Sequence, residues 1–244
     1  MKVLISPISV EEARSVCAGG ADIVDIKNVK EGSLGANFPW VIRDIIASLK
    51  GEKVAFSATL GDLPNKPGTA ALAAAGAAST GVNYIKAGLF GVRDYDEALP
   101  LMKAVTRACR EAAPEVYVVA AGYADYRRFG GLPCLELIRV AHDAGADFVM
   151  VDTAIKDGKT LFDNLSFSEL RDFTAGAHEA GLRVALAGSI RFEHLSELQQ
   201  LDADLIGVRG CVCRSADRNT AIDPSLVRMF VDSARAVAVA SSYA

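Results

Sequence analysis

Four short segments of the chain repeat one pattern of apolar and polar positions. Each begins with an Asp or Asn, continues through mostly apolar residues and ends on a charged residue, at positions 22–27, 83–86, 147–152 and 204–209. Side chains alternate between two faces along a β-strand, so residues separated by an even number of positions share a face. One face is apolar, and the other carries the charged residues Asp25, Lys27, Lys86, Asp152 and Arg209.

Each of these segments belongs to a longer alternation of apolar runs with segments of helical periodicity. The runs predict eight strands, at 3–5, 23–26, 54–58, 84–87, 116–121, 148–151, 184–187 and 205–208, each followed by one helix. Capping boxes are predicted at Ser9 with Glu12 and at Ser166 with Glu169, and further helix starts at Asp94 and at Asp223–Pro224. Glycines before the strands mark the helix ends, at Gly19–Gly20, Gly51, Gly81, Gly145 and Gly181.

Strict alternation of strands and helices predicts a parallel sheet with helices outside it. An open doubly wound sheet and a closed barrel both satisfy the pattern, and a chain of 244 residues is also long enough for two small domains. The repeat favours one domain, and eight strand–helix units at this length favour an α/β TIM (β/α)8 barrel over residues 1–244. The charged residues of predicted strands two, four and six then converge inside the barrel.

The longer loops follow strands and do not precede them. They span 30–38, 61–68, 122–131 and 157–165, and they bear glycine and proline. Catalytic residues of TIM barrels lie at the carboxyl ends of the strands and in the loops that follow them. We therefore expect the active site on this rim, with Lys156 in the loop after the sixth strand.

Composition narrows the class of partner. A net charge of −4 without basic tracts gives no footprint for nucleic acid, and the apolar opening Met1–Ile5 is too short for a signal peptide or a membrane span. The five cysteines form no C-x-x-C pair, which is typical of a reduced, cytoplasmic protein. We expect a small-molecule substrate, with no nucleic acid and no membrane.

Two lysines at the ends of apolar strands require an explanation, because lysine is rarely buried. Lys27 and Lys86 could be ion-paired with Asp25 and Asp152 in a structural network. Alternatively, burial beside other cations lowers the pKa of a lysine and allows it to form a Schiff base. Lowering that pKa from about 10.4 to about 7 costs roughly 4.6 kcal/mol. Three lysines near two carboxylates fit this second interpretation.

Other catalytic groups are poorly represented. All three histidines, His142, His178 and His194, fall in helical patterns and form no ligand set, so neither a metal site nor a Ser/His/Asp triad is expected. No G-x-G-x-x-G follows a strand, so we expect redox-neutral chemistry without a cofactor. Cys211 and Cys213 follow the last strand, where we expect a packing role.

A phosphate site is predicted after the last two strands, where TIM barrels often bind phosphate through backbone N–H groups. Gly188–Ser189 follows the seventh strand and Gly210 the eighth. Arg209 strengthens the prediction, since a guanidinium can bind phosphate bidentately.

The segments Asp25-Ile26-Lys27, Tyr84-Ile85-Lys86 and Val151 to Gly158 resemble the (5-formylfuran-3-yl)methyl phosphate synthases of methanofuran biosynthesis, which serve one-carbon metabolism. The resemblance implies a lyase that joins two molecules of glyceraldehyde 3-phosphate into a furan aldehyde phosphate, losing one phosphate and two waters. It further implies Lys27 as the Schiff-base lysine and Lys86 as proton acceptor, with Asp25, Asp152 and Lys156 in support.

Two other functions stay open. A class I aldolase or isomerase acting on another small sugar phosphate would use the same lysine and phosphate site, and a non-catalytic binder would show saturable binding without turnover. We expect Lys27 to form the covalent adduct, and a protonated Lys86 to lower the Lys27 pKa by like-charge repulsion. A homo-oligomer is expected.

Overall fold

The computed structural model describes residues 1–241, and side chains as far as residue 237; residues 242–244 of the predicted domain lie outside the described part. Its centre is one closed barrel of eight parallel strands, ordered along the sheet as along the chain. The TIM-barrel prediction is confirmed. The strands are β1 (Lys2–Ile5), β2 (Ile23–Ile26), β3 (Ala55–Asp62), β4 (Tyr84–Gly88), β5 (Tyr117–Tyr123), β6 (Phe148–Asp152), β7 (Arg183–Leu186) and β8 (Leu205–Val208).

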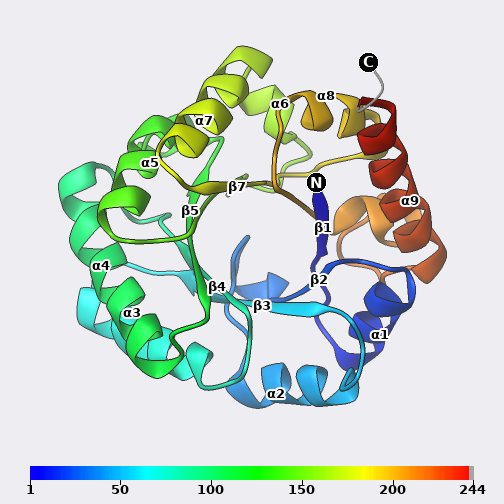
Figure 1. The fold of residues 1–244 in the computed structure, drawn as a ribbon, viewed down its shortest axis with the longest axis horizontal. Helices are drawn as coiled ribbons and strands as arrows, with labels where there is room; N and C mark the ends of the chain where they lie inside the picture. Colours follow the sequence, from blue (N-terminus) through cyan, green and yellow to red (C-terminus); the bar gives the residue numbers. More distant parts are fainter. Residues whose placement is uncertain (242–244) are drawn as a thin grey trace.

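The helices form an outer ring around the barrel (Figure 1). They are α1 (Val10–Ala18), α2 (Pro39–Ser48), α3 (Pro67–Ala78), α4 (Tyr95–Ala112), α5 (Cys134–Asp143), α6 (Leu161–Asn164), α7 (Phe167–Glu179), α8 (Leu195–Gln200) and α9 (Pro224–Ser241). Short 3-10 turns occur at η1 (Val29–Glu31), η2 (Tyr126–Arg128), η3 (Phe192–His194), η4 (Gly210–Val212) and η5 (Arg214–Ala216). No helix among residues 1–241 is both long and apolar enough to cross a bilayer.

The structure differs from the prediction in two places on the rim. β3 and β5 run beyond their predicted ends into segments expected to be loops, because Asp62 pairs with Gly88 after a register shift and Tyr123 pairs with Asp152. The Tyr123 hydroxyl also donates to Asp62, which ties the two extensions together. In addition, the loop 157–165 contains the short helix α6, whose start is fixed by a capping box between Thr160 and Asp163.

Helix starts are predicted well where the cap is purely local. Ser166 and Glu169 form the full capping box at α7, and Asp94 caps α4 by accepting from the Glu97 amide. At α1 only half of the predicted box forms. Ser9 accepts from the Glu12 amide, but the Glu12 carboxylate accepts from Arg209 and from the Ile8 amide. A distant ion pair has displaced the local hydrogen bond.

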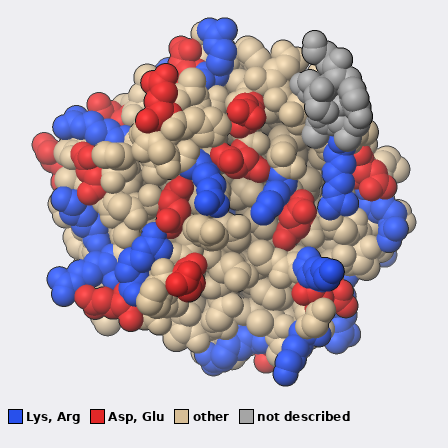
Figure 2. Space-filling view, in the orientation of Figure 1, with Lys and Arg blue, Asp and Glu red and all other residues tan. Residues whose placement is uncertain are grey.

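The inner face of the barrel is apolar at one end and charged at the other. Tyr84, Tyr117 and Phe148 from three strands pack with ring centroids 5.1–5.8 Å apart and fill the end where those strands begin. Two residues further along β4 lies Lys86, and four residues further along β6 lies Asp152. A second apolar layer packs between the strands and the helices. On the face shown in Figure 2, charged side chains of both signs are interspersed.

Candidate active site

A cavity of about 360 Å³ opens at the mouth where the strands end. Its size suits a small metabolite. It is lined by every predicted site residue except Lys86, namely Asp25, Lys27, Asp152, Lys156, Gly188, Ser189, Arg209 and Gly210. Lys86 lies beneath the cavity and contacts Asp25. Residues from strands far apart in the sequence therefore meet at one place.

Lys86 and Asp25 form a buried ion pair. The Lys86 Nζ lies 2.5 Å from Asp25 Oδ1, and both side chains are only 1% exposed. The Ser6 hydroxyl, at the end of β1, donates to Asp25 Oδ2 at 2.9 Å. Burial by itself raises the pKa of Asp25, but the positive charges of Lys86 and Lys27 and the two hydrogen bonds bring that pKa below its ordinary value. Asp25 is therefore a carboxylate at neutral pH.

Asp152 and Lys156 form a second ion pair, nearer the surface. Lys156 Nζ lies 2.8 Å from Asp152 Oδ1, which also accepts from the Thr153 amide at 2.7 Å. The Ser33 hydroxyl donates to Asp152 Oδ2 at 3.2 Å. Burial raises the pKa of Asp152, yet the charges of Lys156 and Lys27 and the hydrogen bonds from Lys156 and the Thr153 amide outweigh burial and hold that pKa well below its ordinary value.

Lys27 lies between the two pairs and belongs to neither. Its side chain is 7% exposed, and its Nζ donates to the backbone carbonyl of Ser33 at 3.2 Å. Among the described residues, no carboxylate lies within ion-pair distance of this ammonium group, whereas Lys86 and Lys156 each have one. The interpretation that the lysines only form structural ion pairs thus accounts for Lys86 and Lys156 but not for Lys27.

The pKa of Lys27 is lowered from 10.5 to about 8. Burial is the main cause; Asp152 and Asp25 raise the pKa, while Lys86 and Lys156 lower it. Like-charge repulsion by Lys86 therefore acts in the predicted direction but contributes less than burial. At pH 7 a pKa of about 8 leaves roughly one amine in ten neutral, against about three in ten thousand for an ordinary lysine. A buried lysine with a lowered pKa is the kind of group that can act as a nucleophile, and that role for Lys27 stays a prediction.

The predicted phosphate loops follow β7 and β8, and residues of both line the cavity. Gly188 and Ser189 both have positive φ angles, 113° and 50°, and Gly210 begins the turn η4. Within residues 1–241, the backbone amides of these three residues donate to no protein acceptor. Free backbone N–H groups in a cavity wall suit an anion. Phosphate binding here stays a prediction.

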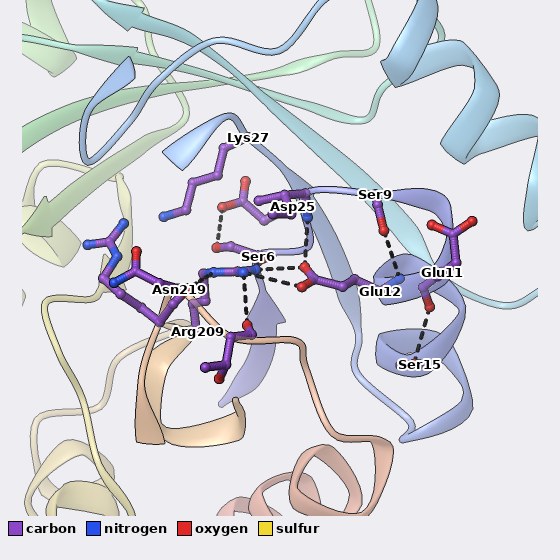
Figure 3. A network of polar contacts seen from close by, with 12 residues as sticks. Ser6, Ser9, Glu11, Glu12, Ser15, Asp25, Lys27, Arg209 and Asn219 are labelled. Atoms are coloured by element: carbon purple, nitrogen blue, oxygen red, sulfur yellow. Dashed lines mark hydrogen bonds and ion pairs between the residues drawn. The ribbon is translucent and has the colours of Figure 1, made fainter. Parts of the chain in front are cut away.

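Arg209 is held by the protein itself. Its guanidinium lies between Ser6 and Glu12 (Figure 3), with Nη1 2.7 Å from the Ser6 carbonyl and 2.8 Å from Glu12 Oε2. Nη2 donates to Glu12 Oε1 and the Thr220 carbonyl, and Nε to the Arg218 carbonyl. All five N–H donors of the group are engaged. Phosphate binding by Arg209 stays a prediction, and it would require one of these bonds to break.

Several residues that shape the site were not predicted. Ser6 and Ser33 orient the two carboxylates, and Asp125 accepts from the Ala154 and Ile155 amides at 2.8 and 2.9 Å, which fixes the loop that carries Lys156. Ser6 follows the first strand directly, so its position at a strand end could have suggested it. Ser33 and Asp125 act through loop conformation, for which the sequence offers no periodicity.

Comparison with known proteins finds one family model and several similar enzymes. The family model described as 4-HFC-P synthase matches residues 3–231. A (5-formylfuran-3-yl)methyl phosphate synthase from Methanothermobacter thermautotrophicus is 54% identical over 220 residues, covering 90% of this chain and 92% of the relative. The enzyme of the same name from Methanocaldococcus jannaschii is 53% identical over 229 residues, covering 93% and 97%.

Solved structures show the fold alone. A 3-hexulose-6-phosphate synthase from Salmonella typhimurium superposes with a TM-score of 0.66 at 17% identity, covering 97% of this chain and all of the other. A phosphoribosyl anthranilate isomerase from Thermus thermophilus gives a TM-score of 0.63 at 18% identity, with coverage of 97% and 100%. Both structures share the barrel fold with this chain.

Proposed function

The chain belongs to the 4-HFC-P synthase family, and from this membership and its site we propose that it joins two molecules of glyceraldehyde 3-phosphate into (5-formylfuran-3-yl)methyl phosphate through an imine on Lys27. Its relatives are enzymes named (5-formylfuran-3-yl)methyl phosphate synthase, and it is an enzyme of that kind. The observation that carries the proposed mechanism is the position of Lys27, buried, without an ion pair among the described residues, and with a pKa of about 8.

The first half of the reaction needs an amine and a proton acceptor. The neutral Lys27 amine adds to the aldehyde carbon of one triose phosphate, and loss of water gives the imine. The imine acidifies the hydrogen on the adjacent carbon, which Lys86 accepts after passing its own proton to Asp25, 2.5 Å away. The resulting enamine expels phosphate from the next carbon, with the electron pair of the carbon–oxygen bond leaving on the phosphate.

The second half forms the carbon–carbon bond. The enol left by elimination attacks the carbonyl carbon of the second triose phosphate, which the same proton transfers have isomerised to its ketone form. Ring closure through a hydroxyl and loss of water then build the furan, and hydrolysis of the imine frees Lys27. Asp152 and Lys156, 2.8 Å apart, supply and remove the protons of the dehydrations. The sum is two trioses in, with one furan, one phosphate and two waters out, and no net oxidation.

The test is incubation of the purified chain with glyceraldehyde 3-phosphate as sole substrate. Ultraviolet absorbance of the furan aldehyde and released inorganic phosphate should rise together in a one-to-one molar ratio. Interconversion of triose phosphates without either product would indicate an isomerase, and carbon–carbon bond formation without phosphate release would indicate a class I aldolase. Binding without turnover would indicate a metabolite-binding protein.

We further propose that the enzyme works in the cytoplasm, as a homo-oligomer, in methanofuran-type cofactor biosynthesis. Support for a reducing compartment comes from the five cysteines, which are all unpaired in the structure. Sedimentation of the purified chain tests the assembly.

A further inference from the structure

Arg218 is a cation in the cavity wall that has no side-chain hydrogen-bond or ion-pair partner among the described residues. It lies in the loop after η5, is half-buried, and lines the cavity with Ser189 and Gly210. Its side chain makes no hydrogen bond and no ion pair with any described residue. Burial lowers the pKa of its guanidinium, and the more distant charge of Asp152 offsets part of that effect. A guanidinium remains charged in spite of such a shift, so the cavity wall carries a positive charge that no described residue pairs with directly.

Arg218 begins beside the predicted phosphate loop. A Cβ atom placed on Gly210 would lie 3.9 Å from the Cβ of Arg218. The free Gly210 amide and the start of the Arg218 side chain therefore adjoin on one wall of the cavity, which Gly188 and Ser189 also line. A dianion between them would meet backbone donors and a planar cation together.

The loop that carries Arg218 is held in an uncommon conformation. Ser215 and Ala216 are consecutive non-glycine residues with φ angles of 55° and 52°, a region that side chains rarely adopt. Such backbone geometry persists only where surrounding contacts impose it, and it is concentrated at ligand sites. Here the contacts include a bridge between Cys213 and Ile222 and hydrogen bonds from Thr220 Oγ1 to the carbonyls of Arg214 and Asp217.

Arg209 also holds the loop that carries Arg218. It donates to the carbonyls of Arg218 at 2.9 Å and Thr220 at 3.5 Å, while Glu12 fixes its guanidinium from α1. Arg209, which directly precedes Gly210 in the sequence, thus holds the backbone of Arg218. The Arg218 guanidinium itself is left to bind a ligand.

We propose that Arg218 is the cationic ligand of a substrate phosphate, completing the site of Gly188, Ser189 and Gly210, and that Arg209 is a positioning residue acting through it. The inference rests on the proposed function only in taking the anion to be a triose phosphate. Arg218 would give the site the bidentate contact that the sequence prediction assigned to Arg209.

The experiment measures inorganic phosphate binding by calorimetry, together with KM and kcat for glyceraldehyde 3-phosphate. Arg218→Gln should weaken phosphate binding about ten- to hundredfold and raise KM similarly, since hydrogen bonds to charged groups contribute about that factor. Arg218→Lys should recover part of the loss, because a lysine restores the positive charge but not the paired N–H donors of a guanidinium. The control is Arg214→Gln on the same loop, an exposed arginine outside the cavity, which changes net charge equally and should leave both constants within about twofold.

A double-mutant cycle separates the two arginines. Arg209→Lys should weaken phosphate binding in the otherwise native chain but cause little further loss beside Arg218→Gln. Additive losses would instead place Arg209 on the phosphate, and unchanged binding in Arg218→Gln would overturn the proposal. Phosphate binding that depends on Arg218 in a chain that forms no furan would refute the proposed function alone, while furan synthesis with an unchanged KM in Arg218→Gln would refute the arginine assignment alone.

Discussion

At the scale of single residues, the three lysines of the mouth differ in their neighbours and not in their side chains. Lys86 and Lys156 each have a carboxylate within 2.8 Å, whereas Lys27 has only the Ser33 carbonyl at 3.2 Å. A paired ammonium ion is stabilised in its charged form, so the lysine without a pair is the one that most easily loses its proton. Lys27 is thus the buried lysine without an ion pair among the described residues, which is why we propose that the imine forms there.

Replacing Lys27 should therefore remove the chemistry and not merely weaken it. Lys27→Arg keeps the charge but cannot provide a nucleophile, and we expect turnover to fall by at least about a thousandfold. Borohydride reduction in the presence of glyceraldehyde 3-phosphate, followed by peptide mass mapping, should find the adduct on the Lys27 peptide of the native chain. An adduct on Lys86 or Lys156 with Lys27 unmodified would contradict the assignment.

The same lysine predicts a pH profile. Because its neutral form reacts and its pKa is about 8, kcat/KM should rise about tenfold per pH unit below pH 8 and level off above it. Steady-state rates between pH 6 and pH 10 would show this, with the spontaneous breakdown of the free substrate measured separately at each pH. A profile already flat at pH 7 would mean that the titration of Lys27 does not limit the reaction.

At the scale of elements, the sequence identified every strand and most helix ends because those depend on local patterns. The alternation of side chains along a strand predicted the face on which Asp25, Lys27, Lys86 and Asp152 lie. Their positions on strands two, four and six predicted that they meet inside one barrel. The prediction was wrong where a long-range contact competes with a local one. Glu12 was assigned to the cap of Ser9, yet its carboxylate pairs with Arg209, 197 positions away in the chain.

That ion pair joins α1 to the residue after β8, across the seam where the first and last strands close the barrel. Both side chains are at least nine-tenths buried, so removing one partner leaves a buried charge. Glu12→Gln should lower the free energy of unfolding by about 3 kcal/mol in urea titrations. Glu111→Gln, which breaks the exposed Arg107–Glu111 pair on α4, serves as the control and should cause no measurable change. Equal stability of the two variants would contradict a structural role for the Glu12–Arg209 pair.

At the scale of the whole molecule, the barrel brings together groups that no single segment contains. Arg218 illustrates what the sequence cannot provide: it follows no strand and belongs to no periodic pattern, and only the closed chain shows that it adjoins Gly210. Charge placement at the mouth has a global consequence as well. Asp25 and Asp152 are buried carboxylates whose pKa values lie below their ordinary range, so the folded state binds protons less readily than the unfolded chain.

The stability of the molecule should therefore fall in acid. A depressed carboxylate pKa contributes stability above the unfolded value, near pH 4, and the contribution is lost as pH falls toward the folded value. Urea unfolding at successive pH values from 7 to 3 should show this decline. Asp152→Asn should be less stable than the native chain at pH 7, because Lys156 loses its ion-pair partner and Lys27 loses a nearby negative charge. The stability of this variant should decrease less steeply below pH 4. Asp172→Asn, at a side chain 63% exposed on α7, provides the matched control and should follow the native curve. If Asp152→Asn also followed the native curve at every pH, the charges at the mouth would not contribute to folding, and their arrangement would serve catalysis alone.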